Sequence, residues 1–191
     1  MFSNLRRLGL LLAPALVCLQ LATASDLPQL SFNELTDNSE LVVSGRITRT
    51  WADWDPAHTY IWTHYELAVS AAHKGAAART VDIAEPGGIL NGIVMSISGG
   101  TGYHVGDNVL VFLSRMPNGY LRTAGFGQGK YAVDSNGRLH GTPALRITDP
   151  VSAGSGNAAA ASAVRSLNGL SLAQVSQLVG TRVQTRGGNG R

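Results

Sequence analysis

The chain has 191 residues, a single cysteine and a formal net charge of +3. Its charge is uneven, because residues 25–149 carry twelve acidic and nine basic side chains, whereas residues 150–191 carry four arginines and no acidic residue. The mildly acidic central part argues against a nucleic-acid-binding body, because such domains present a basic surface to the phosphates.

The N-terminal segment, residues 1–24, is predicted to be a secretory signal peptide. Arg6 and Arg7 precede the apolar run LGLLLAPALVCLQLA, and the small residues of the following ATA motif allow cleavage before Ser25. A membrane anchor is the alternative interpretation. It is less well supported, because Pro14 interrupts the run and a bilayer requires about 20 apolar residues. We therefore expect an exported protein of the periplasm or the extracellular space.

Cleavage at this site would remove Cys18, the only cysteine of the chain. A mature chain without cysteine has no disulfide bond, no thiol nucleophile and no thiolate ligand for zinc. The domain must then be stabilised by its apolar core, and its length is sufficient for one, since domains typically contain about 100–150 residues.

The first predicted element of the mature chain is a short helix that ends near Asn38. Ser31 can cap this helix, and Glu34 completes a capping box. The run LVVSGRITRTW, residues 41–51, has the β-branched content of a strand, and Gly45 within it indicates a bulge. The next segment, ADWDPAH, is predicted to be a turn-rich loop because of its Asp-Pro pair.

Alternating side chains predict a long strand in residues 59–75. Its two faces carry Ile61, Thr63, Tyr65, Leu67 and Val69 on one side and Tyr60, Trp62, His64, Glu66 and Ala68 on the other. Shorter strands are expected at 81–86, in the second half of 89–100, at 108–113, and as two or three strands in 116–139 with turns at Asn118-Gly119 and Asn136-Gly137.

The composition changes after Asp149. Residues 150–169 are rich in Ala, Gly and Ser and are predicted to be a flexible linker. Within 170–191 a short helix is expected, capped by Ser171 and followed by a disordered basic tail. The apolar face of this helix would carry Leu172, Val175, Leu178 and Val179. Residues 25–149 then form the folded domain, and its many short strands predict an all-β fold, a small OB-like β-barrel.

Several of these segments together resemble an uncharacterised family of small exported bacterial proteins. The motifs are LVVSGRI, the KG turn at the end of the long strand, EPGG, GDNVLVFL and GFGQGKYAV, which together cover roughly residues 35–134. The resemblance implies an extracytoplasmic partner, since some members of that family accompany matrixin-like metalloproteases. A more distant similarity links the same motif order to netrin-like and tissue-inhibitor-like OB barrels. The chain lacks the cysteines of that group, so only the barrel is implied, and the zinc-chelating mode of those inhibitors does not transfer.

Aromatic residues supply the candidate ligand-binding site. Trp51, Trp54, Tyr60 and Trp62 lie around one predicted loop, and an aromatic groove on a barrel can stack sugars or bases. The alternative is that these side chains pack against the barrel end, as large aromatic residues commonly do.

A metal site is the remaining candidate, with His58, His64 and Glu66 as its ligands. The spacing is poor, because neither H-x-H nor H-x-x-x-H occurs. G-x-S-x-G is also absent, and the glycine-rich GGTGYHVG is followed by a strand rather than by the helix of a phosphate-binding loop.

We therefore expect a non-catalytic binding module that is not an enzyme, has no cofactor, does not span a membrane and binds another extracytoplasmic protein. Two alternatives stay open: binding of cell wall or polysaccharide through the aromatic residues, and metal-dependent hydrolysis.

Overall fold

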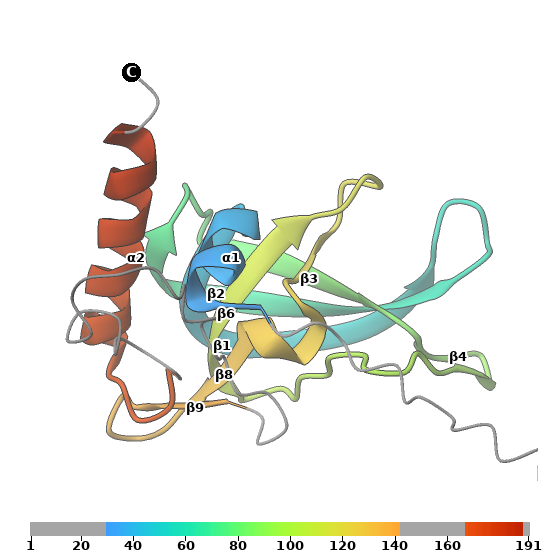
Figure 1. Cartoon of the computed structure of the whole chain (residues 1–191). Coiled ribbons are helices and arrows are strands. Elements are labelled where there is room, and N and C mark those ends of the chain that lie inside the picture. Colours follow the sequence, from blue (N-terminus) through green and yellow to red (C-terminus); the bar gives the residue numbers. More distant parts are fainter. Residues whose placement is uncertain (1–29, 142–166, 189–191) are drawn as a thin grey trace, which may run out of the picture.

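The computed structural model describes residues 30–141 and 167–188 (Figure 1). Strands predominate in this part of the chain, and two α-helices accompany them, so the prediction of a mainly β fold with a helix near each end is confirmed. The predicted signal peptide and most of the predicted linker, residues 150–166, lie outside the described residues.

Helix α1 (Phe32–Asn38) begins after Ser31, as the capping box predicts, and ends at Asn38, as was also expected. The backbone N–H of Glu34 donates to Ser31 Oγ over 3.2 Å, and the N–H of Ser31 donates to Glu34 Oε2 over 2.8 Å. These two bonds satisfy backbone donors that a helix N-terminus otherwise leaves without a partner.

Strands β1 (Leu41–Trp54) and β2 (Ile61–Lys74) form one long antiparallel hairpin. The register shifts at Gly45 as predicted, and a β-carbon there would collide with the carbonyl oxygen of Ala68. The predicted loop at 52–58 is too long by three residues, because β1 continues through Trp54, which pairs with Ile61. Cross-strand pairing therefore extends the strand into a segment whose composition is typical of a turn.

The remaining elements follow in chain order: β3 (Thr80–Pro86), β4 (Gly88–Leu90), β5 (Ile93–Met95), β6 (Asn108–Arg115), β7 (Leu121–Thr123), the 3₁₀ turn η2 (Phe126–Gly129), β8 (Lys130–Val133), β9 (Leu139–Gly141) and α2 (Leu172–Gly188). Strands β7, β8 and β9 agree with the two or three strands predicted in 116–139, although β9 continues to Gly141. Both predicted Asn-Gly turns are also present.

Seven strands form one sheet in the order β1-β2-β3-β7-β6-β8-β9, and β1 also pairs with β6. The pairing path β1-β2-β3-β7-β6 thus returns to β1, and we call these strands the five-strand ring. Its weakest link joins β3 to β7 through a single residue pair, Ile83 with Leu121, whereas seven residue pairs join β2 to β3.

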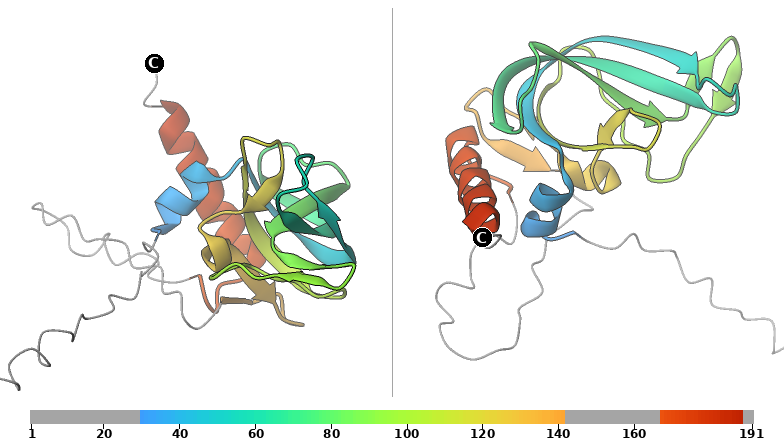
Figure 2. Two further views of the ribbon diagram at one scale, coloured as in Figure 1. Left: turned by 90° about the vertical axis from the view of Figure 1, so that its right-hand side faces the viewer. Right: turned by 90° about the horizontal axis from the view of Figure 1, so that it is seen from above.

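Strands β4 and β5 form a separate hairpin, the β4–β5 arm, residues 88–95. Asn91 and Gly92 have positive φ values of 51° and 81°, as a two-residue type I′ turn requires. The prediction of one strand in the second half of 89–100 was therefore wrong, because the two strands lie in its first half and no strand follows Met95 up to residue 100. The arm and the end of the β1–β2 hairpin project from the same side of the molecule (Figures 1 and 2).

Two apolar clusters form the core. One lies within the five-strand ring, with Ile47, Leu67, Ile83 and Val111 among its members. The other lies between the sheet and the two helices, on the side of the molecule opposite the arm (Figure 1). Its residues from α2, Val175 and Val179, are fully buried, which agrees with the predicted apolar face of this helix.

The C-terminal region departs from two predicted boundaries. Leu167, placed in the linker by its composition, is fully buried in the second cluster. Helix α2 also continues to Gly188, well beyond the predicted short helix, so a disordered tail beginning near Arg186 is wrong. One physical reason is the ion pair between Arg182 and Asp37 of α1, with N–O distances of 2.6 and 3.0 Å, which holds the second half of α2 against the domain.

Candidate functional site

Two of the predicted aromatic residues belong to a cluster on the outer face of β1 and β2. Trp51 stacks on His64, with ring centroids 5.1 Å apart and planes 9° apart, and Tyr120 contacts both His64 and Trp62 edge-on at 5.3 and 5.1 Å. We call Trp51, Trp62, His64 and Tyr120 the outer aromatic stack. Tyr120 comes from the β6–β7 turn, so its part in the cluster could not be read from the spacing of the tryptophans.

The outer aromatic stack is closely packed rather than open. Trp62 is 9% exposed and His64 7% exposed, and the guanidinium of Arg49 lies 4.4 Å from the Trp51 ring centroid. His64 Nδ1 lies 2.9 Å from Asp82 Oδ2, which fixes the imidazole against the sheet. These rings pack against one another, although the Nε1–H of Trp62 has no hydrogen-bond partner within the described residues. The close packing favours the packing interpretation of Trp51 and Trp62 over a free stacking platform.

The other two predicted residues, Trp54 and Tyr60, lie at the far end of the β1–β2 hairpin. Trp54 contacts His58 with ring centroids 6.1 Å apart, and Tyr60 is half-exposed. The four predicted residues therefore divide between two places: a packed stack and a projecting hairpin end.

The structure does not bring the three candidate metal ligands together. His58 lies in the hairpin turn, His64 faces Asp82, and Glu66 is bonded to Thr48 and paired with Arg49 at 3.4 Å. No group of three or more metal-binding side chains occurs in residues 30–141 and 167–188.

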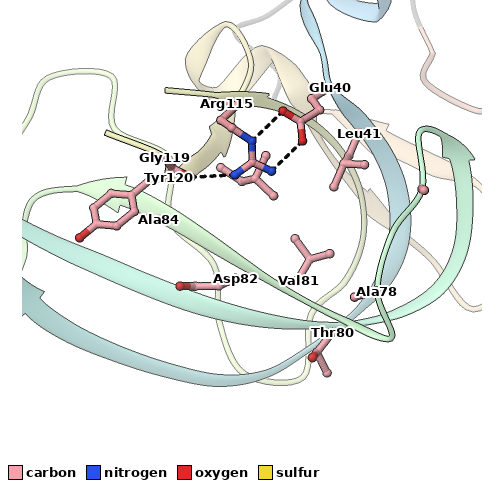
Figure 3. A pocket seen from close by; sticks show the side chains of 12 residues that line it. Glu40, Leu41, Ala78, Thr80, Val81, Asp82, Ala84, Arg115, Gly119 and Tyr120 are labelled. Carbon is pink, nitrogen blue, oxygen red and sulfur yellow. Dashed lines mark hydrogen bonds and ion pairs between the residues drawn. The ribbon is translucent and has the colours of Figure 1, made fainter. Parts of the chain in front are cut away.

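A pocket of about 370 Å³ opens beside the outer aromatic stack, at the weak link between β3 and β7 (Figure 3). We call it the seam pocket. Its polar rim consists of Glu40, Asp82, Arg115 and Tyr120, and apolar side chains that include Leu41 and Val81 line its interior. Its volume lies within the range of small-ligand pockets, about 300–1,000 Å³.

The polar wall of the seam pocket is a two-pronged ion pair. Arg115 donates to both carboxylate oxygens of Glu40, over 2.6 and 2.8 Å, and its remaining Nη1 donates to the carbonyl of Gly119 (Figure 3). These hydrogen bonds hold the pKa of Glu40 below its ordinary value. Asp82 provides a half-exposed carboxylate on the opposite side, where a ligand could reach it.

An apolar surface forms at the projecting side of the molecule. Ile89, Ile93 and Val94 of the β4–β5 arm are 68%, 50% and 69% exposed, and Tyr60 of the neighbouring hairpin end is 50% exposed. We call these four residues the apolar tip. Strand β4 contacts both β1 and β2, so the base of the arm lies against the hairpin whose end carries Tyr60.

Sequence reasoning missed a buried polar network at the end of β3. Glu85 is only 2% exposed, and its carboxylate accepts hydrogen bonds from the N–H of Thr123 over 2.8 Å and from Arg122 Nε over 3.1 Å. Burial raises the pKa of Glu85 in spite of these bonds. The Thr123 hydroxyl is also bonded to Tyr103, so the network joins three distant segments. The EPGG motif contains Glu85, but nothing in that sequence indicates that its carboxylate is buried.

Ser44 and His73 form a serine–histidine pair that does not have the setting of a catalytic nucleophile. Ser44 Oγ lies 3.0 Å from His73 Nε2, but Ser44 is 2% exposed and cannot meet a substrate. Burial lowers the pKa of His73.

Comparison with known proteins adds no family assignment. The chain matches no model of a protein family, and no curated protein matches it significantly. Neither of the helices in the described part of the chain has the length and apolar character needed to cross a bilayer.

Proposed function

We propose that this chain is an exported, non-catalytic OB-like β-barrel module that binds another extracytoplasmic protein through its apolar tip. The closed pairing path of the five-strand ring supports the barrel, since a sheet whose last strand pairs with its first encloses a core. The predicted signal peptide supports export.

The exposed apolar side chains of the tip carry the binding proposal. Ile89 and Val94 lie opposite each other on the arm, and more than two thirds of each is in contact with solvent. No Lys, Arg, Asp or Glu occurs between Glu85 and Asp107, so the arm has no charged side chain of its own to keep it solvated. Exposed apolar side chains such as Ile89 and Val94, which lie on one face of the arm, are typical of protein–protein contacts.

The motif resemblance supports the choice of the first partner to test. Because the family that the motifs resemble includes members that accompany matrixin-like metalloproteases, an extracytoplasmic metalloprotease of the native host is the first candidate. The proposal concerns binding alone, and no catalytic group of this chain takes part in it.

A photo-crosslinking amino acid at position 89 tests the proposal in the native host. We expect a discrete adduct that is identified by mass spectrometry and is lost when Val94→Lys is added, because a lysine there introduces an unpaired charge into the contact.

Val105→Lys is the matched control for this experiment. Val105 is 58% exposed but lies in the turn before β6, outside the arm, so its substitution should leave the adduct unchanged. If no adduct forms, or if Val94→Lys and Val105→Lys weaken it equally, the apolar tip is not the binding surface.

Saccharide binding is a second candidate, and the seam pocket favours it. Tyr120, a half-exposed Asp82 and the Glu40–Arg115 pair place an aromatic ring beside carboxylate and guanidinium groups that can bond sugar hydroxyls. This site replaces the predicted tryptophan platform, whose Trp62 is buried.

Sedimentation with insoluble murein tests this second candidate. If the seam pocket binds the glycan, Asp82→Asn should release the chain from the pellet. Asp53→Asn, in β1 and outside the pocket lining, should not. Equal sedimentation of both variants and the wild type would exclude the seam pocket as a glycan site.

A further inference from the structure

The lining of the seam pocket carries an unbalanced negative charge. Its charged side chains are those of Glu40, Asp82 and Arg115, two carboxylates and one guanidinium, which leaves a net charge of −1. Arg115 compensates Glu40, because its Nε and Nη2 donate to the two oxygens of that carboxylate and its Nη1 donates to the carbonyl of Gly119. The charge that no lining side chain balances is therefore that of Asp82.

The carboxylate of Asp82 is open to a ligand. The side chain is 49% exposed, its Oδ2 lies 2.9 Å from His64 Nδ1, and its Oδ1 has no hydrogen-bond partner within the described residues. An uncharged imidazole that donates to Oδ2 leaves the negative charge in place. The residue opposite on β2 is Glu66, also acidic, and it is the partner of Arg49. A ligand that brings a positive charge to Oδ1 would supply the missing counter-charge.

An aromatic ring lies beside this carboxylate. Tyr120 and Asp82 both line the pocket and both contact His64, the tyrosine with ring centroids 5.3 Å apart (Figure 3). An aromatic ring attracts a cation through its quadrupole, so a positive group at this position gains from the ring as well as from the carboxylate.

The deeper part of the pocket is apolar. Val81 and Leu41 face each other across it, whereas the side chain of Asp82 points away from them, and each of the two apolar side chains is only 6% exposed (Figure 3). The apolar part of the lining is completed by Ala76, Ala78, Ala84 and Leu121. These side chains can cover methylene groups, but they offer no hydrogen-bond partner to a hydroxyl. The volume of about 370 Å³ leaves room for a short alkyl chain.

The same lining disfavours other small ligands. A divalent metal ion requires several oxygen ligands, and the pocket offers one carboxylate without a counter-charge. An anion would approach Asp82 while Arg115 is already engaged by Glu40. A neutral saccharide can bond to the polar rim but leaves the charge of Asp82 unbalanced, so a saccharide meets the requirement only as an amino sugar.

We propose that the seam pocket binds a primary ammonium group on a short alkyl chain, as in a lysine side chain, with the ammonium at Asp82 and Tyr120 and the chain against Leu41 and Val81. This inference goes beyond the proposed protein contact. The seam pocket contains no residue of the apolar tip, so either proposal can fail without the other.

Titration of the secreted chain with n-pentylamine and with 1-pentanol, followed by NMR chemical shifts, tests the charged group. The two probes share their alkyl chain and differ in charge. At about pH 8, where imidazole rings are ordinarily uncharged, we expect pentylamine to bind at least about fivefold more tightly and to weaken as salt is added. Equal binding of the two probes would overturn the inference.

A series from ethylamine to pentylamine tests the alkyl chain. Each methylene that is covered by the apolar wall should raise the affinity about threefold. An affinity that is the same throughout the series would mean that the ammonium pairs with Asp82 at the surface alone. Glucosamine, which carries its ammonium on a polar ring, should bind at least about fivefold more weakly than pentylamine. Equal or tighter binding of glucosamine would reject the alkyl chain and make an amino sugar the ligand.

Asp82→Asn removes the charge and keeps an oxygen that can accept a hydrogen bond from His64. This variant should weaken pentylamine about fivefold. Asp53→Asn makes the same change outside the pocket lining and should alter the affinity less than about twofold. Circular dichroism establishes that both variants are folded. Pentylamine that binds Asp82→Asn as tightly as wild type would exclude the proposed site.

Discussion

Apolar side chains are covered on one side of this molecule and exposed on the other. On one side α1 and α2 cover the sheet, and Leu35, Val175 and Val179 are fully buried. On the other side the apolar tip leaves Ile89 and Val94 more than two thirds exposed (Figure 1). Both sides carry aliphatic residues, so the two sides do not differ in composition. They differ in whether other segments of the chain cover these side chains. The chain covers its own apolar surface where it has helices to do so, and we attribute the uncovered tip to a contact with another molecule.

The largest expected loss of stability comes from placing a charge in the apolar cluster beneath α2. Val179→Asp places a carboxylate in a fully buried position of α2 and should lower the free energy of unfolding by about 4 kcal/mol. Val183→Asp on the same helix, at a position that is 42% exposed, should cost less than about 1 kcal/mol. Urea denaturation followed by circular dichroism measures both. Equal losses would mean that α2 is not docked as described.

A second prediction compares two aromatic residues on one face of β2 and its preceding turn. Trp62→Ala removes a side chain that is 9% exposed and should destabilise the fold by about 3 kcal/mol. Tyr60→Ala removes one that is 50% exposed and should cost less than about 1 kcal/mol. Thermal unfolding distinguishes them. A Trp62→Ala variant that stays stable but no longer binds insoluble murein would instead support the stacking-platform interpretation of the tryptophans.

The third prediction concerns how the stability contributed by the Asp37–Arg182 ion pair, on the covered side, depends on pH. Hydrogen bonds from Arg182 lower the pKa of Asp37 below 3.8, so the pair stabilises the fold above that pH, and this contribution is lost as the pH falls through the depressed pKa. Because solvent reaches the pair, the contribution should be below about 1 kcal/mol. Asp37→Asn should therefore be less stable than wild type at pH 7 and equally stable in strong acid. A difference that persists in acid would assign the loss to packing.

The smallest effect is expected at the apolar tip itself. Ile89→Ala and Val94→Ala should leave the free energy of unfolding within about 0.5 kcal/mol of wild type, because their side chains contact mainly solvent. Val94→Ala should also weaken the adduct that forms from the crosslinking amino acid at position 89. A large loss of stability here would show that the arm packs against the rest of the chain, and the contrast between the two sides would disappear.

The local features of the fold could be predicted from the sequence. The capping box of Ser31 and Glu34, the alternation in β2 and the turn at Asn136-Gly137 each depend on residues close together in the chain. The turn at Asn91-Gly92 has the same signal but was overlooked, because strands of three residues on each side are too short to show alternation.

The features that were not predicted depend on distant partners. Trp54 belongs to a strand because Ile61 pairs with it, and Leu167 is buried because the second cluster lies beneath it. Glu85 and Arg122 are 37 residues apart, so no spacing rule relates them. Ile89 and Val94 have the composition of core strand residues, and only the three-dimensional arrangement shows that nothing in the described chain covers them.

The single pair between Ile83 and Leu121 also has a consequence for motion. Strand β1 has a hydrogen-bonded neighbour on each side, whereas the junction of β3 and β7 is closed by one bridge. We expect the amide hydrogens at this junction to exchange with solvent well before those of Val42 and Val43, because opening it breaks few bonds. The five-strand ring would then open transiently at the junction of β3 and β7. A ligand that spans the seam pocket would slow this amide exchange by holding the two strands together.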